Sequence, residues 1–95
     1  MKKKLYISLP ISGHDIEEVK HRAALAKKHY SEKYDVITPF DICTDEAATY
    51  ANCMGKDIEA LLECDVIFLM TGWQKSKGCM AEFYVAQVYN KQILM

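Results

Sequence analysis

Glu82 is the only charged side chain in residues 79–89, a stretch whose composition predicts a largely apolar helix. At about 100° per residue, Val85, Ala86 and Tyr89 lie on the same helix face as Glu82. Burying a polar group without a partner costs roughly 2–7 kcal/mol, and an ionised carboxylate costs more. Glu82 must therefore be paired, protonated or functional.

Asp57 is a second acid inside an apolar stripe, between Met54 and Leu61 of a helix predicted over 53–63. If this helix and that of Glu82 begin at one edge of a sheet, both carboxylates can face one pocket. In a partly apolar pocket their pKa values would be pushed apart, leaving one acid and one base or nucleophile.

Two structural interpretations fit the same acids. Asp57 can serve to stabilise the positive end of its helix dipole. Glu82 can pair with Lys77 or with a lysine across an oligomer interface. The sequence pattern alone leaves these alternatives open.

The elements that must position these acids alternate along the chain. An apolar run that contains no polar side chain, as expected for a central parallel strand, spans residues 66–70. The predicted strands are 5–9, 34–38, 66–70 and 92–95, and the predicted helices are 15–30, 53–63 and 78–89, with 40–51 a loop containing one short helical turn. This βαβαβαβ order predicts an α/β fold, a small doubly wound, flavodoxin-like or Rossmann-like parallel sheet of four to five strands with helices on both faces.

Ligands of such sheets bind outside the carboxyl ends of the strands, where loop 10–14, the loop after Pro39 and loop 71–77 lie. The first loop leads into a helix capped by Asp15, and its glycine and backbone N–H groups fit either a phosphate site or an ordinary turn. In the third loop, Trp73 is either a stacking wall for a flat ligand or a cover for a neighbouring subunit. Ser76 is a candidate N-cap of the last helix.

The composition limits the class of protein. Ninety-five residues predict a single domain over 1–95, and 12 basic against 13 acidic side chains argue against nucleic-acid or membrane-surface binding. The four cysteines form no CxxC pair and no histidine stands at a metal-ligand spacing from them. We therefore expect four free, buried thiols, no metal and a reducing cytoplasmic setting. The small sheet leaves apolar surface to cover, which favours a homodimer or a higher homo-oligomer.

Three stretches carry a family resemblance: YISLPISG at 6–13, DIEALLECD at 57–65 and GWQKSKGCMAE at 72–82. Together they resemble the small bacterial and phage proteins grouped as a domain of unknown function beside the nucleoside 2-deoxyribosyltransferases. The chain also resembles, more weakly, the 2′-deoxynucleoside 5′-phosphate N-hydrolases of the same superfamily. The resemblance extends over nearly the whole chain.

The resemblance implies a retaining glycosyl transfer or hydrolysis that needs no cofactor. Glu82 matches the nucleophile that attacks the anomeric carbon, Asp57 matches the acid that protonates the leaving base, and Tyr6 matches a tyrosine that positions the nucleophile. A glycosyl-enzyme ester on Glu82 would be released by water or by a second base. Alternatives on the same fold are a non-catalytic nucleotide-binding module and an oligomeric structural protein.

The resemblance also implies the residues that contact a nucleoside or nucleotide. Ser76 matches a serine near a 5′-phosphate or 5′-hydroxyl group, and the Ser12–Gly13 turn approaches the sugar-phosphate. The full set of expected substrate-binding residues is Ser8, Pro10, Ser12, Gly13, His14, Trp73, Ser76 and Gly78. The chain differs from the transferases at Leu9, at Tyr84 and in the loop 71–75.

Overall fold

The computed structural model describes residues 2–45 and 47–95. Its elements alternate as the sequence pattern predicts, and the short helical turn expected near residues 40–51 is present as a four-residue helix. Two features were not predicted: the next helix begins inside that stretch, and the loop after the third strand holds a short 3-10 helix. In chain order they are β1 (Lys3–Ser8), α1 (Ile16–Tyr30), β2 (Tyr34–Ile37), α2 (Pro39–Ile42), α3 (Tyr50–Leu62), β3 (Val66–Leu69), η1 (Trp73–Lys75), α4 (Lys77–Val88) and β4 (Gln92–Leu94).

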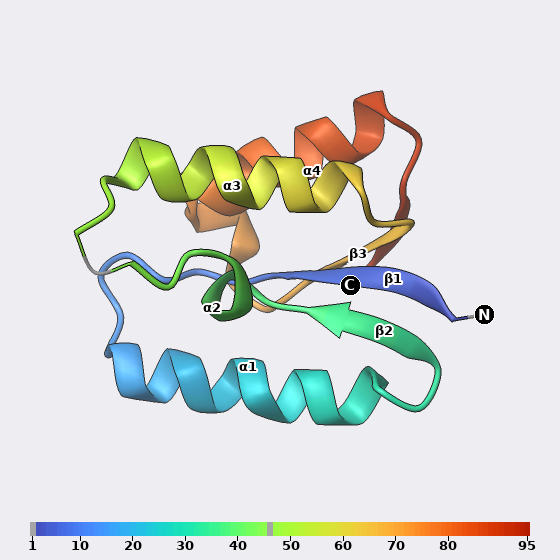
Figure 1. Cartoon of the computed structure of the whole chain (residues 1–95), viewed down its shortest axis with the longest axis horizontal. Helices are drawn as coiled ribbons and strands as arrows, with labels where there is room; N and C mark the ends of the chain where they lie inside the picture. Colours follow the sequence, from blue (N-terminus) through green and yellow to red (C-terminus); the bar gives the residue numbers. More distant parts are fainter. Residues whose placement is uncertain (1, 46) are drawn as a thin grey trace.

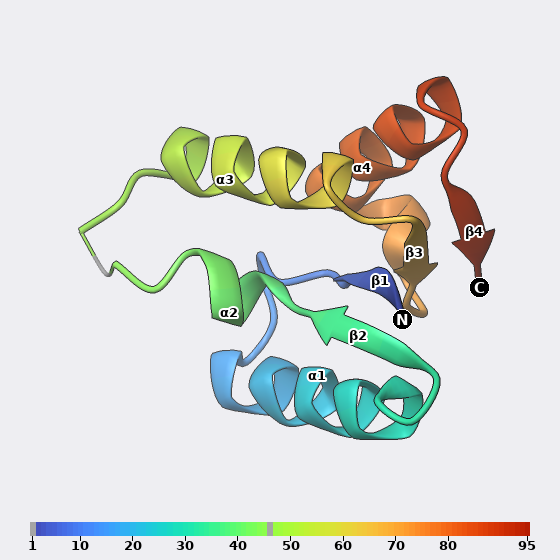
Figure 2. The same cartoon turned by 45° about the vertical axis from the view of Figure 1, so that its right-hand side comes forward.

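The strands form one parallel sheet of four strands in the order β2-β1-β3-β4. Helix α1 covers one face of the sheet, and α3 and α4 cover the other (Figures 1 and 2). The predicted α/β class, with a small parallel sheet and helices on both faces, is confirmed.

Alternate residues of β1 serve the two faces, because successive side chains of a strand point in opposite directions. Leu5 and Ile7 belong to the apolar cluster under α1, together with Val19 and Ala23. Tyr6 belongs to the cluster on the α3 and α4 side. All three β1 residues are fully buried, so this strand fixes both halves of the core.

The three long helices begin with side-chain caps. Asp15 accepts from the backbone N–H of Glu17, Thr49 from that of Asn52, and Ser76 from that of Cys79, at 3.2, 3.1 and 3.3 Å. These bonds satisfy N–H groups that have no partner within the helix. The predicted caps Asp15 and Ser76 are confirmed, whereas Thr49 starts α3 three residues earlier than expected.

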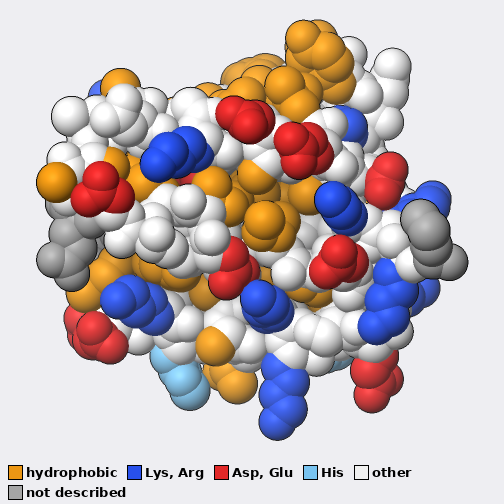
Figure 3. All heavy atoms as spheres, in the orientation of Figure 1, with side chains coloured by type: hydrophobic (Ala, Val, Ile, Leu, Met, Phe, Trp, Pro, Cys, Tyr) orange, Lys and Arg blue, Asp and Glu red, His pale blue; other side chains and the backbone are white. Residues whose placement is uncertain are grey.

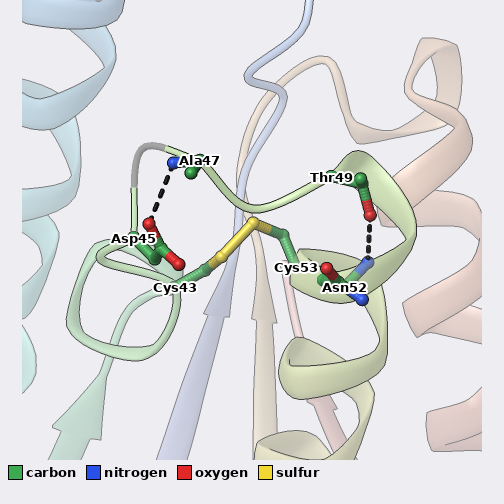
Figure 4. Close-up of a disulfide and its surroundings, with 6 residues drawn as sticks. All are labelled: Cys43, Asp45, Ala47, Thr49, Asn52 and Cys53. Atoms are coloured by element: carbon green, nitrogen blue, oxygen red, sulfur yellow. Dashed lines mark hydrogen bonds between the residues drawn. A yellow bond between two sulfur atoms is a disulfide. The ribbon is translucent and has the colours of Figure 1, made fainter.

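The expectation of four free thiols is wrong for two of them. Cys43 and Cys53 form a disulfide with their Cα atoms 5.3 Å apart (Figure 4). Cys43 caps the end of α2 and Cys53 lies in the first turn of α3, so the reversal of the chain between the two helices brings them together. Cys64 and Cys79 are free and buried, as expected.

The outer surface of α4 is partly apolar. Tyr84, Val88 and Tyr89 are 56%, 72% and 60% exposed. Tyr89 was expected on the buried face of Glu82, but α4 ends at Val88 and the helical periodicity no longer applies beyond it. Apolar side chains also gather along the α4 edge of the molecule, whereas basic and acidic side chains are interspersed over the rest of the face in Figure 3.

Among the described residues, none of the helices has the length and apolar character needed to cross a membrane.

Candidate active site

Glu82 lies in the second turn of α4 and is 5% exposed. Its Oε2 accepts a hydrogen bond of 2.7 Å from the Tyr6 hydroxyl, and its Oε1 accepts one of 2.6 Å from the Ser8 hydroxyl. Tyr6 and Ser8 are alternate residues of β1, so both side chains point toward the α3 and α4 layer. The strand therefore holds both oxygens of this carboxylate in place.

The pKa of Glu82 lies near neutral pH. Burial raises the pKa of Glu82 to about 7, against the lowering effect of the hydrogen bonds from Ser8 and Tyr6, and the nearby charge of Asp57 adds to the rise. Burial, reinforced by the charge of Glu82, raises the pKa of Tyr6 well above its usual value. Tyr6 thus remains a neutral donor.

Glu82 is not paired with a lysine of its own chain. Within residues 2–45 and 47–95, the ion pair that forms joins Lys27 to Asp41 at 3.0 Å, away from Glu82. The lysine-pairing interpretation within one subunit therefore does not hold, and two neutral hydroxyls take the place of a counter-charge.

Asp57 is the second buried acid, 9% exposed, on the inner face of α3. Burial raises its pKa to about 6. Its Oδ1 atom is buried and has no hydrogen-bond partner among the described residues. Since α3 begins at Tyr50, Asp57 lies two turns inside the helix, beyond the reach of the helix-dipole interpretation.

Asp57 and Glu82 line one pocket of about 350 Å³. The pocket lies at the carboxyl edge of the sheet, between the β1–α1 loop, the start of α3 and the η1–α4 turn. Its volume falls within the range of small-molecule sites. Its apolar walls come from Leu9, Ile11, Pro39 and Met54.

Most of the residues predicted to contact substrate reach this pocket. Besides the two acids, those lining it are Pro10, Ser12, His14, Ser76 and Gly78. Tyr6 and Ser8 lie outside the lining, where they contact Glu82. Gly13 also lies outside the lining, and its φ of +83° is a left-handed conformation that suits glycine.

Trp73 and Tyr84, the two large aromatic residues considered from sequence, lie outside the pocket lining. The Trp73 ring packs against Phe83 of α4, with ring centroids 4.7 Å apart, and joins the apolar cluster on that side of the sheet. Tyr84 is exposed on the outer side of α4. The difference from the transferases at Tyr84 therefore leaves the pocket open, and Trp73 anchors its loop to α4.

Sequence reasoning missed several lining residues. Lys75 and Lys77 line the pocket on either side of Ser76, and their place in the predicted ligand loop was an available signal. Tyr50 and Met54 form the outer wall, and a Cβ atom on Gly78 would lie 3.3 Å from Tyr50 Oη. Tyr50 was missed because it falls in a stretch predicted as a loop.

The fold and the pocket together define an α/β protein that places a pair of buried carboxylates at the ligand-binding edge of a parallel sheet. The chain belongs to the family described as "Domain of unknown function (DUF4406)", which matches residues 3–95. Among curated proteins no match is found.

Among solved structures the chain is similar to "2-desoxiribosyltransferase from Leishmania mexicana", with 25% sequence identity and a TM-score of 0.65. The match covers 97% of this chain and 62% of the other, so the chain spans less than two thirds of that protein's length. The predicted resemblance to the nucleoside 2-deoxyribosyltransferases is thus confirmed for the fold.

Proposed function

We propose that this protein breaks the N-glycosidic bond of 2′-deoxyribonucleosides or their 5′-monophosphates. The observation that carries the proposal is the Glu82 carboxylate, buried and held at both oxygens by Tyr6 and Ser8, with Asp57 in the same pocket. Similarity in fold to a 2-desoxiribosyltransferase supports the substrate class.

In the first step, a Glu82 oxygen attacks C1′ of the deoxyribose and forms an ester bond. The bond between C1′ and the base nitrogen breaks, its electron pair stays on the base, and protonated Asp57 supplies a proton to the leaving base. The unpartnered Oδ1 of Asp57 supports this role, because that atom has no protein partner to give up when a ligand arrives.

In the second step, water or a second base attacks C1′ and the ester bond to Glu82 breaks. The Asp57 carboxylate takes up the proton that the attacking group releases, so both acids return to their starting states. Attack from opposite faces in the two steps retains the configuration at C1′.

Tyr6 and Ser8 are positioning residues in this proposal, since they act on the substrate through Glu82. Their hydroxyls fix the direction of the carboxylate and favour its ionised form, which is the nucleophile. The alternation of β1 places both donors on one face, so two hydroxyl groups can serve one carboxylate.

The rim of the pocket supports recognition of a 5′-phosphate. Lys75, Lys77 and His14 line it, and Ser12 and Ser76 add hydroxyl groups. Two lysine charges beside backbone N–H groups at the start of α4 suit a phosphate dianion. We assign Pro10, Gly13 and Gly78 to the shape of the two turns that approach the ligand.

The test compares the wild type with Glu82→Gln on the four common 2′-deoxynucleosides and their 5′-monophosphates. Chromatography measures the free base, and intact-protein mass spectrometry detects the glycosyl ester. We expect base release by the wild type and a loss of about 10³-fold or more in Glu82→Gln, because the amide is a poor nucleophile.

The matched control is Glu59→Gln, the same chemical change at an exposed position of α3 outside the pocket. It should leave base release unchanged. Failure of the wild type to release a base from any substrate in the panel would refute the proposal.

A nucleotide-binding module without turnover is the second candidate. It is favoured by burial raising the pKa of Glu82 to about 7, because a protonated carboxyl group is a poor nucleophile. It predicts that a nucleotide raises the unfolding temperature of the wild type and of Glu82→Gln alike, with no base released.

We also propose that the protein is a homodimer or a higher homo-oligomer. The exposed Tyr84, Val88 and Tyr89 give α4 an apolar outer surface that a second copy would cover. Sedimentation velocity tests this: Val88→Glu should shift an oligomer toward monomer, whereas a monomeric wild type would contradict the proposal.

A further inference from the structure

We propose that the Cys43–Cys53 disulfide is a redox-sensitive brace of the pocket, which holds the first turn of α3 in place until a dithiol opens it. The closed form binds ligand more tightly than the open form. The inference rests on the pocket being the ligand site of the proposed function, but it does not require turnover.

The disulfide joins two walls of the pocket. Cys43 ends α2, whose first residue Pro39 lines the pocket. Cys53 stands in the first turn of α3, between Tyr50 and Met54, which line it from the other side. Figure 4 shows the bond spanning the end of α2 and the start of α3. The disulfide therefore links two walls of the pocket covalently.

Among the described residues, the other contacts of this turn of α3 are few and mostly local, and one of them is the backbone hydrogen bond of 3.1 Å from the Cys53 N–H to the Thr49 carbonyl. Thr49 Oγ1 accepts from the Asn52 N–H at 3.1 Å, a bond between exposed residues. Tyr50 is 63% exposed, and its hydroxyl rests close to Gly78 of α4. A turn with few buried contacts opens locally at low free-energy cost, so loss of the disulfide should raise its mobility.

The link is open to reagents, unlike the other two cysteines. Cys43 and Cys53 are partly exposed, whereas Cys64 and Cys79 are each 2% exposed. Burial also raises the pKa of both free thiols, and that of Cys64 reaches about 11, which keeps them protonated and unreactive. Thiol exchange is therefore expected at the disulfide and not at Cys64 or at Cys79, although Cys79 lines the pocket.

A dithiol of the thioredoxin or dithiothreitol class supplies the two electrons that reduce the disulfide. One thiolate attacks a sulfur of the disulfide and forms a mixed disulfide, and the second thiolate displaces the remaining protein sulfur. Two electrons and two protons pass to the protein. The products are the thiols of Cys43 and Cys53 and the oxidised dithiol.

The first measurement is hydrogen exchange of the amides of residues 50–54, without any ligand. Dithiothreitol should speed their exchange several-fold and leave the amides of β1 and β3 unchanged. Cys43→Ser/Cys53→Ser should match the reduced wild type before reductant is added and show no response afterwards, which also controls for effects of the reagent on Cys64 and Cys79.

The second measurement is the Kd of the four 2′-deoxynucleoside 5′-monophosphates, each titrated against oxidised and reduced wild type. We expect reduction to raise Kd about tenfold, because binding must then order the side chains of Tyr50 and Met54. If no probe binds, the proposed function fails for 5′-monophosphates, and the exchange rates still decide whether the brace exists.

Three results would overturn the inference: four free thiols in protein prepared under oxidising conditions, exchange at 50–54 that does not respond to complete reduction, or a double variant that still responds to dithiothreitol. An unchanged Kd on reduction, with faster exchange at 50–54, would overturn its link to ligand binding.

Discussion

Tyr6 Oη donates a hydrogen bond of 2.7 Å to Glu82 Oε2 across a sequence separation of 76 residues. The bond joins an inner strand of the sheet to the second turn of α4, where Glu82 lines the pocket. Burial and the charge of Glu82 raise the pKa of Tyr6, so the phenol stays protonated and stabilises the ionised form of Glu82.

Removing this hydroxyl should weaken catalysis through Glu82. In Tyr6→Phe the pKa of Glu82 rises further, because one of its two hydroxyl donors is lost while burial remains. We expect kcat/KM at neutral pH to fall about tenfold and the limb assigned to Glu82 ionisation to move to higher pH.

Tyr30→Phe is the matched control, since Tyr30 packs against Phe68 on the opposite side of the sheet. Its pH profile should superimpose on that of the wild type. A Tyr6→Phe profile that also superimposes would show that the hydrogen bond does not tune Glu82.

The two acids predict a bell-shaped pH dependence of kcat/KM. The active form carries one proton on the pair, with Glu82 ionised and Asp57 protonated, and it is the less populated of the two singly protonated forms because the pKa of Glu82 lies above that of Asp57. The pKa of Glu82 is about 7 and that of Asp57 about 6. Because the two charges interact, the acid and alkaline limbs of the pH profile report the titration of the pair and not of either acid alone. Initial rates between pH 5 and 9 should peak between the two values, and a plateau extending above pH 8 would contradict Asp57 as the acid.

The same shifts predict that the fold is more stable in mild acid. The folded state holds protons on Glu82 up to about pH 7 and on Asp57 up to about pH 6, whereas the unfolded carboxyls lose theirs near their ordinary values of 4.5 and 3.8. This stabilisation is complete below about pH 4 and is lost as the pH rises through about 6 and 7.

The expected loss is on the order of 3 kcal/mol for each acid, at 1.36 kcal/mol per pH unit. Urea denaturation at pH 5 and pH 8 measures the part of this loss that falls between those two pH values, on the order of 2–3 kcal/mol for Glu82 and 1 kcal/mol for Asp57. Glu82→Gln should remove about two thirds of the difference, since glutamine does not titrate. A free energy of unfolding that rises from pH 5 to pH 8 would contradict the assigned shifts.

The parts of the site that could be predicted are those with a strong local signal. Glu82 interrupts an apolar helix and Asp57 interrupts an apolar stripe, and both lie in the pocket. The alternation of strands and helices was enough to predict which sheet edge holds them. Neither the choice of the two acids nor the choice of the sheet edge required knowing which residues contact them.

The parts that could not be predicted depend on pairing between distant segments. Ser8 and Tyr6 share a strand face, but the residues of β1 do not indicate which acid they hold: the family resemblance implied the Tyr6–Glu82 contact, and the Ser8–Glu82 bond was not predicted. The Cys43–Cys53 pairing requires a chain reversal within residues 40–51, where no periodicity indicated a helix. Tyr50 became a wall residue because Thr49 starts α3 early.

The lysines beside Ser76 should distinguish a nucleotide from a nucleoside. Lys75→Ala and Lys77→Ala each remove a positive charge from the rim of the pocket, and both acids stay in place. We expect KM for 5′-monophosphates to rise about five- to tenfold with kcat little changed, and the effect to shrink at high salt as the charges are screened. KM for the matching nucleosides should not change.

Lys56→Ala, on an exposed part of α3 outside the lining, controls for the loss of a lysine. Equal increases in KM for nucleosides and nucleotides would place these side chains at the sugar or the base instead of the phosphate.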